Sequence, residues 1–180
     1  MGRLTSFTPR SLVMGVLLEN QGLLETVVTR LEEKYGPVLN TSGLSLFTYT
    51  DYYDREMGTK PHRCYLQFRT LVDPARLSAV KIETNAIEDL FRNDRGRRVN
   101  LDPGLLSLEN LILATTKNRS HRIPLCDGIY AEVTLQYENH AFQAFRWTYA
   151  DYNSEEVKKL FFRWRSVYHE QLKQEGCLAT

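Results

Sequence analysis

The segment Arg63-Cys-Tyr-Leu-Gln-Phe-Arg69 is the clearest β-strand pattern in the chain. Cys64, Leu66 and Phe68 alternate with residues that are charged, amphipathic or polar, which is the period of a half-buried strand. Asp73-Pro74 follows at once, a capping carboxylate and a proline suited to the first turn of a helix. The sequence therefore predicts a strand that leads directly into a helix.

The residues before this segment predict another strand, a helix and then a further strand. Leu12 to Leu18 is an apolar run typical of a buried strand. Apolar residues then recur at helical spacing from Leu23 to Tyr35, and Gly36-Pro37 ends the helix. Residues from Val38 to Thr48 resemble the next strand.

The residues after Pro74 predict a second helix and a short strand. Apolar or small side chains share one helical face at Leu77, Val80, Thr84, Ile87 and Phe91. Val99 to Leu101 then returns to extended chain. The first hundred residues have the order β-α-β-β-α-β, which predicts a ferredoxin-like sandwich with two helices on one face of an antiparallel sheet.

The second half is richer in strands. Asp102-Pro-Gly104 is a turn pattern, and Leu105 to Thr116 fits either strand or helix, with strand favoured. Ile129 to Tyr137 alternates regularly, and Glu138-Asn-His140 predicts a turn into a strand from Phe142 to Tyr149.

The chain closes with an amphipathic helix from Val157 to Leu172, and Asn153 with Glu156 has the spacing of a capping box. The prediction is one compact α+β domain over residues 1–180. Its ferredoxin-like first half is extended by additional antiparallel strands and by this C-terminal helix.

Composition excludes several classes of protein. The 180 residues carry a formal net charge of +1, which argues against a dedicated nucleic-acid coat. No apolar run approaches the roughly 20 residues that span a bilayer, and the three scattered cysteines form no disulfide or zinc pattern. We therefore expect a cytoplasmic protein without a membrane segment. Phosphate-loop, dinucleotide and serine-hydrolase motifs are absent from the sequence.

Two segments of the chain are nearly identical. Phe47-Thr-Tyr-Thr-Asp-Tyr52 recurs as Trp147-Thr-Tyr-Ala-Asp-Tyr152. One interpretation is a pair of similar strand-to-helix corners with tyrosine rings packed at the edge of the core. The other is that Asp51 and Asp151 converge on one cleft and hold a cation or a polyol. Both interpretations remain open at this point.

A cationic loop follows the ambiguous segment. Its sequence, Lys117-Asn-Arg-Ser-His121-Arg122, suits a phosphate or carboxylate, because arginine binds such groups bidentately and lysine acts as a point charge. His121 could serve as a general acid or base near neutral pH. An ordinary solvated loop is the alternative.

Glu132 lies in the middle of a predicted strand, on a polar face with Tyr130, Thr134 and Gln136. This face either meets solvent or lines a pocket, where Glu132 would be the best candidate for a base or a metal ligand, with His121 or Asp102 nearby. No metal-ligand motif or cofactor motif is present, so the sequence assigns neither a metal nor a cofactor.

These residues support three hypotheses of function. The first is binding of a phosphorylated or anionic small molecule, with catalysis as an option. Its residues are Lys117, Arg122 and Tyr130 for the anion, His121 and Glu132 as acid–base groups, and Asp51, Asp102 and Asp151 as cation ligands or rim. The second is an RNA-binding module that uses the Arg63/Tyr65/Gln67/Arg69 face for base stacking. The third is a protein-interaction domain without a ligand site.

Several long segments resemble an uncharacterised bacterial family, domain of unknown function 4416 (DUF4416). They are Asp51-Tyr-Tyr-Asp-Arg-Glu-Met-Gly58, Asn100-Leu-Asp-Pro-Gly104, Leu113-Ala-Thr-Thr-Lys117, His121-Arg-Ile123, Gly128-Ile-Tyr-Ala-Glu-Val-Thr-Leu135 and Trp147-Thr-Tyr-Ala-Asp-Tyr152. The resemblance implies a small stand-alone bacterial protein without an established activity. Pro124 and Ala150 depart from the family pattern, and Pro124 predicts an edge strand.

Overall fold

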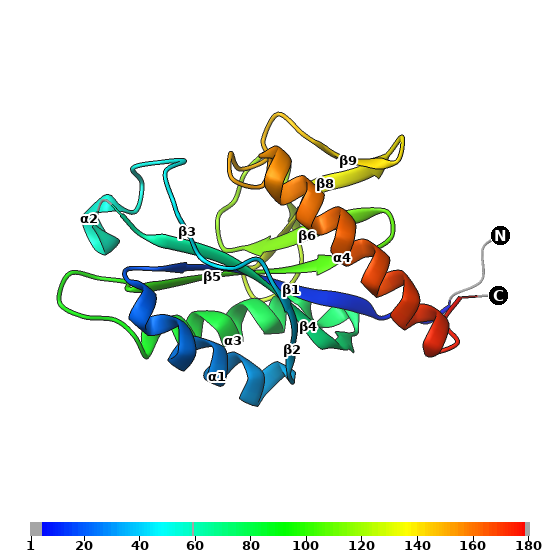
Figure 1. The fold of residues 1–180 in the computed structure, drawn as a ribbon, viewed down its shortest axis with the longest axis horizontal. Helices are drawn as coiled ribbons and strands as arrows, with labels where there is room; N and C mark the ends of the chain where they lie inside the picture. Colours follow the sequence, from blue (N-terminus) through cyan, green and yellow to red (C-terminus); the bar gives the residue numbers. More distant parts are fainter. Residues whose placement is uncertain (1–4, 59, 179–180) are drawn as a thin grey trace.

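The computed structural model describes residues 5–58 and 60–178 and has the predicted α+β class (Figure 1). Its nine described strands form one antiparallel sheet. The strands are β1 (Arg10–Leu18), β2 (Val38–Thr41), β3 (Ser45–Leu46), β4 (His62–Val72), β5 (Val99–Leu106), β6 (Asn110–Thr115), β7 (Ile123–Pro124), β8 (Tyr130–Glu138) and β9 (Ala141–Ala144). The α-helices are α1 (Leu24–Tyr35), α2 (Asp54–Met57), α3 (Leu77–Asp89) and α4 (Glu155–Gln174), with short 3-10 turns before α1 and α3.

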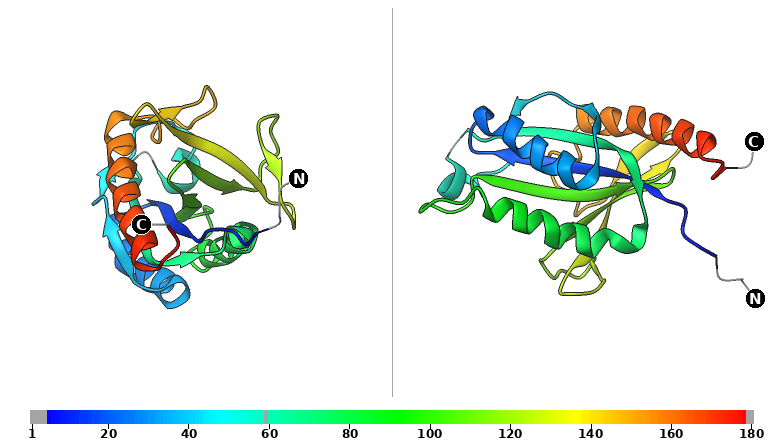
Figure 2. Two further views of the ribbon diagram at one scale, coloured as in Figure 1. Left: turned by 90° about the vertical axis from the view of Figure 1, so that its right-hand side faces the viewer. Right: turned by 90° about the horizontal axis from the view of Figure 1, so that it is seen from below.

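The strand order is β2-β4-β1-β5-β6-β8-β7, with β3 paired to β4 and β9 paired to β8. Helices α1 and α3 cover one face of the sheet, and α4 crosses the other (Figures 1 and 2). The three long helices, α1, α3 and α4, each bury the apolar stripe that a 3.6-residue period predicts. In α4 the stripe includes Leu160, Phe161 and Trp164. No helix in the described part of the chain has both the length and the apolar character of a membrane span.

Most local predictions from the sequence are confirmed. Asp73 caps the turn before α3, since its side chain accepts a hydrogen bond from the Ala75 amide at 2.9 Å. The ambiguous segment contains a strand, β6. Asn139 and His140 both have positive φ, as a tight hairpin turn between β8 and β9 requires. The edge position predicted from Pro124 is also confirmed, because β7 is the last strand of the order.

The predicted turn at Asp102-Pro-Gly104 is wrong, because all three residues lie inside β5. β6 pairs with β5 only over Gly104 to Leu106, so Pro103 lies where β5 has a single neighbour, β1. A missing N–H on the open side of a strand breaks no ladder hydrogen bond. Gly104 serves close packing here, because a Cβ atom would lie 2.6 Å from Leu113 Cδ2 and 2.9 Å from the Ile112 carbonyl oxygen.

The predicted cap of the last helix is wrong by one residue. Ser154, not Asn153, occupies the N-cap position, and its hydroxyl accepts a hydrogen bond from the Val157 amide at 3.3 Å. Ser154 also donates to the Asp151 carbonyl at 2.8 Å. Serine and asparagine are comparable caps, so this local choice depends on how the preceding chain is anchored.

A test of the β5–β6 contact is the substitution Gly104→Ala. The new methyl group meets backbone as well as a side chain, so we expect a loss of about 1–3 kcal/mol in the free energy of unfolding. Urea denaturation measures this loss. Gly22→Ala is the matched control, because its Cβ would meet only the flexible Asn20 side chain, at 3.2 Å. Equal stabilities of the two variants would contradict the close packing.

Candidate functional site

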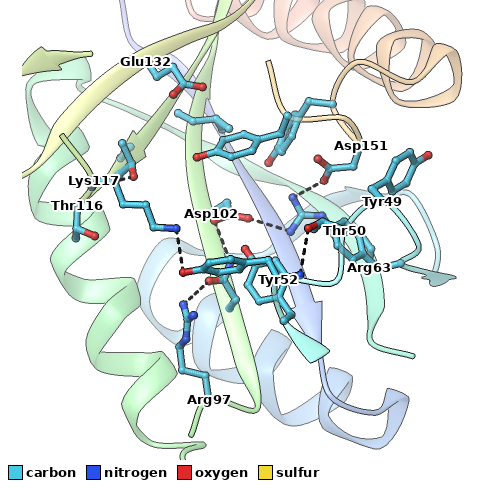
Figure 3. Close-up of a pocket in the computed structure, with 18 of the residues that line it drawn as sticks. Tyr49, Thr50, Tyr52, Arg63, Arg97, Asp102, Thr116, Lys117, Glu132 and Asp151 are labelled. Atoms are coloured by element: carbon cyan, nitrogen blue, oxygen red, sulfur yellow. Dashed lines mark hydrogen bonds and ion pairs between the residues drawn. The ribbon is translucent and has the colours of Figure 1, made fainter. Parts of the chain in front are cut away.

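A cavity of about 370 Å³ lies where β5 and β6 cease to pair (Figure 3). The ladder between these strands ends at the pair Gly104 and Leu113, so the first half of β5 does not pair with β6. The polar and aromatic lining comes from both halves of the chain: Phe47, Tyr49, Thr50, Tyr52, Tyr53, Arg63, Lys81, Asn85, Glu88, Arg97, Asn100, Asp102, Thr115, Thr116, Lys117, Glu132, Tyr149, Asp151 and Tyr152.

Two buried side chains of α3 satisfy the backbone that β6 leaves unpaired. Lys81 Nζ donates to the Leu101 carbonyl at 2.7 Å, and Glu88 Oε1 accepts from the Leu101 amide at 2.8 Å. The two side chains also pair with each other at 3.5 Å. Burial raises the pKa of Glu88 above its usual value, although the nearby Lys81 charge acts to lower it. Together they hold β5 in place beside the gap.

Arg63 of β4 forms the floor of the cavity and is only 5% exposed. Its Nη1 pairs with Asp102 of β5 and its Nη2 with Asp151, each at 2.9 Å. Tyr65 donates its hydroxyl hydrogen to the same Asp151 oxygen at 2.8 Å. The guanidinium carbon lies 4.8 Å from the centre of the Tyr65 ring and 5.4 Å from that of Tyr152. Buried charge is stable only when paired in this way.

Asp102 illustrates the balance of forces at this floor. Burial acts to raise its pKa, but the charges of Arg63 and Lys81 and a hydrogen bond from Asn100 outweigh burial. The net result is a pKa below the usual value of an aspartate, so Asp102 carries its charge at neutral pH. Its side chain is 29% exposed and thus reaches the cavity.

Gly15 of β1 makes room for this arrangement. It lies opposite Tyr65 on one side and Asp102 on the other. A Cβ atom there would lie 2.5 Å from the Tyr152 hydroxyl oxygen and 2.7 Å from Arg63 Nη2. The residue is glycine because two side chains occupy the space that any other residue would need.

Glu132 stands on the opposite wall and is 2% exposed. One carboxylate oxygen, Oε2, receives Arg122 Nε at 2.7 Å and contacts His121 Nε2 at 3.0 Å. The other oxygen, Oε1, is buried and has no hydrogen-bond partner among the described residues. A buried, unpaired acceptor is costly, which makes Oε1 the clearest position for a ligand donor.

Arg122 and His121 hold Glu132 from behind and do not line the cavity. The remaining nitrogens of Arg122 donate to the Lys117 carbonyl at 2.7 Å and to the Tyr149 hydroxyl at 2.8 Å. The His121 ring stacks on Trp147 with centroids 4.9 Å apart. The guanidinium of Arg122 is therefore committed to internal contacts, so the structure gives no support to its predicted role in gripping an anion.

Lys117 follows the end of β6 and is exposed on the rim. Its Nζ donates to the Tyr52 hydroxyl at 3.2 Å and lies 4.4 Å from the centre of that ring. This hydrogen bond and the positive charge lower the pKa of Tyr52 below its usual value. Lys117 thus connects the cationic loop with the first tyrosine segment across the cavity (Figure 3).

Both tyrosine segments line the cavity, but their aspartates differ. Asp151 is buried against Arg63, whereas Asp51 is exposed and lies outside the lining. The backbone carbonyl of Asp51 accepts from the Asp54 amide at 3.0 Å, in the turn before α2. The interpretation in which both aspartates converge on the cleft is wrong. No group of three or more His, Cys, Asp or Glu in the part of the chain that the structure describes is arranged to hold a metal ion.

The structure divides the predicted site residues into three groups. Lys117, Glu132, Asp102 and Asp151 line the cavity; His121 and Arg122 support its wall; and Tyr130 and Asp51 lie outside it. Sequence reasoning missed Arg63, Lys81 and Asn100 as parts of the site. Arg63 was assigned to the face predicted for RNA stacking, and its carboxylate partners become visible only from the strand pairing.

The surface predicted for RNA stacking is not available. Tyr65 is 4% exposed and Gln67 is fully buried, because α4 and Tyr152 cover that face of β4. The Gln67 amide donates to Ser11 Oγ at 3.0 Å and to the Trp164 carbonyl at 3.2 Å. Rings and amides held in this way cannot receive bases, so this placement of an RNA site is wrong.

The fold and the cavity define a class: an α+β protein with one antiparallel sheet and a polar, tyrosine-rich pocket at a split between two strands. A family model described as "Domain of unknown function (DUF4416)" matches residues 8–168, which is most of the chain. The chain therefore belongs to the DUF4416 family. Neither a curated protein nor a solved structure gives a significant match.

Arg63→Met tests whether the floor depends on the guanidinium. The change leaves Asp102 and Asp151 without their common partner, and breaking a buried pair from one side costs about 3–5 kcal/mol of stability. Arg69→Met, on the exposed end of the same strand, should change stability by less than about 0.5 kcal/mol. Urea denaturation measures the free energy of unfolding of both variants. A loss in Arg63→Met as small as that in Arg69→Met would show that the floor does not depend on the guanidinium.

Asp102→Asn tests the charge balance through pH. Because the folded pKa lies below the unfolded value of about 3.9, the stabilisation from Asp102 is complete above that pH. It is lost as the pH falls through the folded pKa. We expect the free energy of unfolding to fall more steeply below pH 4 in the unchanged protein than in Asp102→Asn. Asp94→Asn, at an exposed position, is the control. If the free energy of unfolding of Asp102→Asn depends on pH below pH 4 as that of Asp94→Asn does, the result would be evidence against the ion pair.

Proposed function

We propose that the protein binds a phosphorylated or otherwise anionic small molecule in the cavity between β5 and β6. One observation carries the proposal: Lys117 of the cationic loop and Glu132 of β8, both singled out by their chemistry, line the same cavity. Glu132 contributes a buried oxygen with no partner among the described residues. Lys117 contributes a positive charge at the mouth.

Lys117 is the cationic side chain of the lining with the weakest internal pairing. Arg63 is held by two carboxylates, Lys81 by Glu88 and a carbonyl, and Arg97 by Glu56 at 2.8 Å. The Lys117 ammonium donates only to the Tyr52 hydroxyl among the residues that the structure describes. An ammonium has three donors, so a phosphate or carboxylate at the mouth can take the others without breaking an ion pair.

The shape of the cavity also supports a small-molecule ligand. Its volume of about 370 Å³ lies within the roughly 300–1,000 Å³ that is usual for ligand sites. Aromatic rings from both tyrosine segments form much of the wall, and a few polar groups converge between them. In such a cavity, contact with the aromatic rings contributes affinity for the ligand, and the hydrogen bonds fix the orientation of the ligand.

Glu132 is the candidate acid–base group if the protein is an enzyme, because its carboxylate lies at the cavity. His121 and Arg122 are then positioning residues, since neither lines the cavity and both contact the Glu132 carboxylate. The stacking of His121 on Trp147 fixes the ring and so supports this role. The proposal concerns binding, and catalysis is an extension of it.

We also infer that the first half of the chain is ferredoxin-like. The support is the order β2-β4-β1-β5 with antiparallel pairing throughout, and the helices α1 and α3 on one face. We further propose that the protein works in the bacterial cytoplasm. Cys64, Cys126 and Cys177 are free thiols, as is usual in a reducing compartment.

Thermal unfolding in the presence of anions tests the binding proposal. A ligand at about 100 times its Kd stabilises the folded state by about 2.7 kcal/mol, or about 5–10 °C in Tm for a domain of this size. We expect such a shift with at least one phosphorylated compound from a panel of sugar phosphates, nucleotides and phosphorylated acids.

Lys117→Met should reduce that shift, because it removes the charge at the mouth and leaves the fold unchanged. Lys159→Met, exposed on α4, is the matched control and should respond like the unchanged protein. The absence of a shift with every anion, or equal shifts in Lys117→Met and the control, would refute the proposal.

A further inference from the structure

The charges of the cavity wall nearly cancel. Four cationic side chains face four carboxylates: Arg63, Lys81, Arg97 and Lys117 against Glu88, Asp102, Glu132 and Asp151. Within the described part of the chain, all of these cations except Lys117 are held in ion pairs. A second anionic group deep in the cavity would lie beside carboxylates, and the cations there are already paired. The charged end of a ligand therefore belongs at the mouth, beside Lys117, and the part that enters the cavity is neutral.

The interior offers hydrogen-bond acceptors to that neutral part. Glu132 Oε1 is unpaired among the described residues. Asp151 uses one oxygen, Oδ2, for both Arg63 and Tyr65, so its Oδ1 takes part in no hydrogen bond of the described chain. Each oxygen of Asp102 accepts one hydrogen bond and keeps a lone pair. The ligand must bring several donors.

The aromatic wall restricts the class further. Tyrosine rings from both segments carry negative charge on their faces, and Tyr49, Tyr52 and Tyr149 are each partly exposed, at 44%, 55% and 43%. Carbon-bound hydrogens that are polarised by neighbouring hydroxyl groups fit against such faces. Hydroxyl groups also donate and accept, so they suit a wall that mixes carboxylates, amides and phenols.

We propose that the ligand is a sugar phosphate or a phosphorylated polyol. Its phosphate lies at Lys117, its hydroxyl groups donate to Glu132 Oε1 and Asp151 Oδ1, and its carbon skeleton rests on the tyrosine rings. This inference rests on the proposed function and names the class of molecule that the same cavity takes.

Isothermal titration calorimetry with matched ligands tests the class. The probes are glucose 6-phosphate, ribose 5-phosphate and glycerol 3-phosphate, with butyl phosphate as an equally charged compound without hydroxyl groups. Free glucose and ribose lack the phosphate, and AMP adds a base. We expect at least one of the three hydroxylated phosphates to bind at least tenfold more tightly than butyl phosphate and than the free sugars.

Two variants assign the contacts. Glu132→Gln keeps the shape of the side chain but weakens the acceptor, so it should lower the affinity for the sugar phosphate about tenfold and leave that for butyl phosphate unchanged. Lys117→Met should lower both affinities. Circular dichroism checks that Glu132→Gln folds. If this variant does not fold, the comparison of hydroxylated phosphates with butyl phosphate in the unchanged protein tests the inference.

The outcomes separate the two proposals. If butyl phosphate binds as tightly as every hydroxylated phosphate, hydroxyl recognition is refuted while anion binding stands. Binding of AMP without binding of ribose 5-phosphate would mean that a base is recognised, which also overturns the inference. If none of these anions binds, and the wider thermal panel gives no shift, the proposed function fails as well.

Discussion

The buried guanidinium of Arg63 is the interaction on which the cavity depends. It is the common partner of Asp102 on β5 and of Asp151, which lies 88 residues further along the chain than Arg63 itself. A buried guanidinium is stable only when opposite charges lie in fixed positions beside it. Because Arg63 and Asp151 come from different halves of the chain, their ion pair fixes where the second tyrosine segment rests on the sheet. The start of α4 follows directly, since Ser154 bonds back to Asp151.

The second requirement is the gap between β5 and β6. A continuous ladder would fill this space with backbone, and the cavity would not exist. The gap persists because Lys81 and Glu88 of α3 satisfy the Leu101 backbone that a neighbouring strand would otherwise pair. The proline at position 103 fits the same arrangement, since it has no hydrogen to offer to a strand on that side. The sheet is thus interrupted by side chains at the place where a ligand can enter.

Periodicity predicted α1, α3, α4 and most strands, because apolar spacing reflects which face is buried. It could not show that α4 covers the second face of β4, so Arg63 and Tyr65 were assigned to an open surface. Their partners depend on strand register and on a helix a hundred residues away, and a single sequence contains neither. Lys117 and Glu132 were found from residue type alone. The roles of Arg122 and His121 changed because only geometry shows that both are bound to Glu132.

We propose that an anion binds at Lys117, at the mouth of a cavity shared by both tyrosine segments. Titration of the ¹⁵N-labelled protein with inorganic phosphate, followed by amide chemical shifts, tests this claim most directly. We expect saturable shifts that are largest at Thr116, Lys117 and Tyr52. Shifts confined to the basic turn at residues 92–98, or no saturable shift, would contradict it.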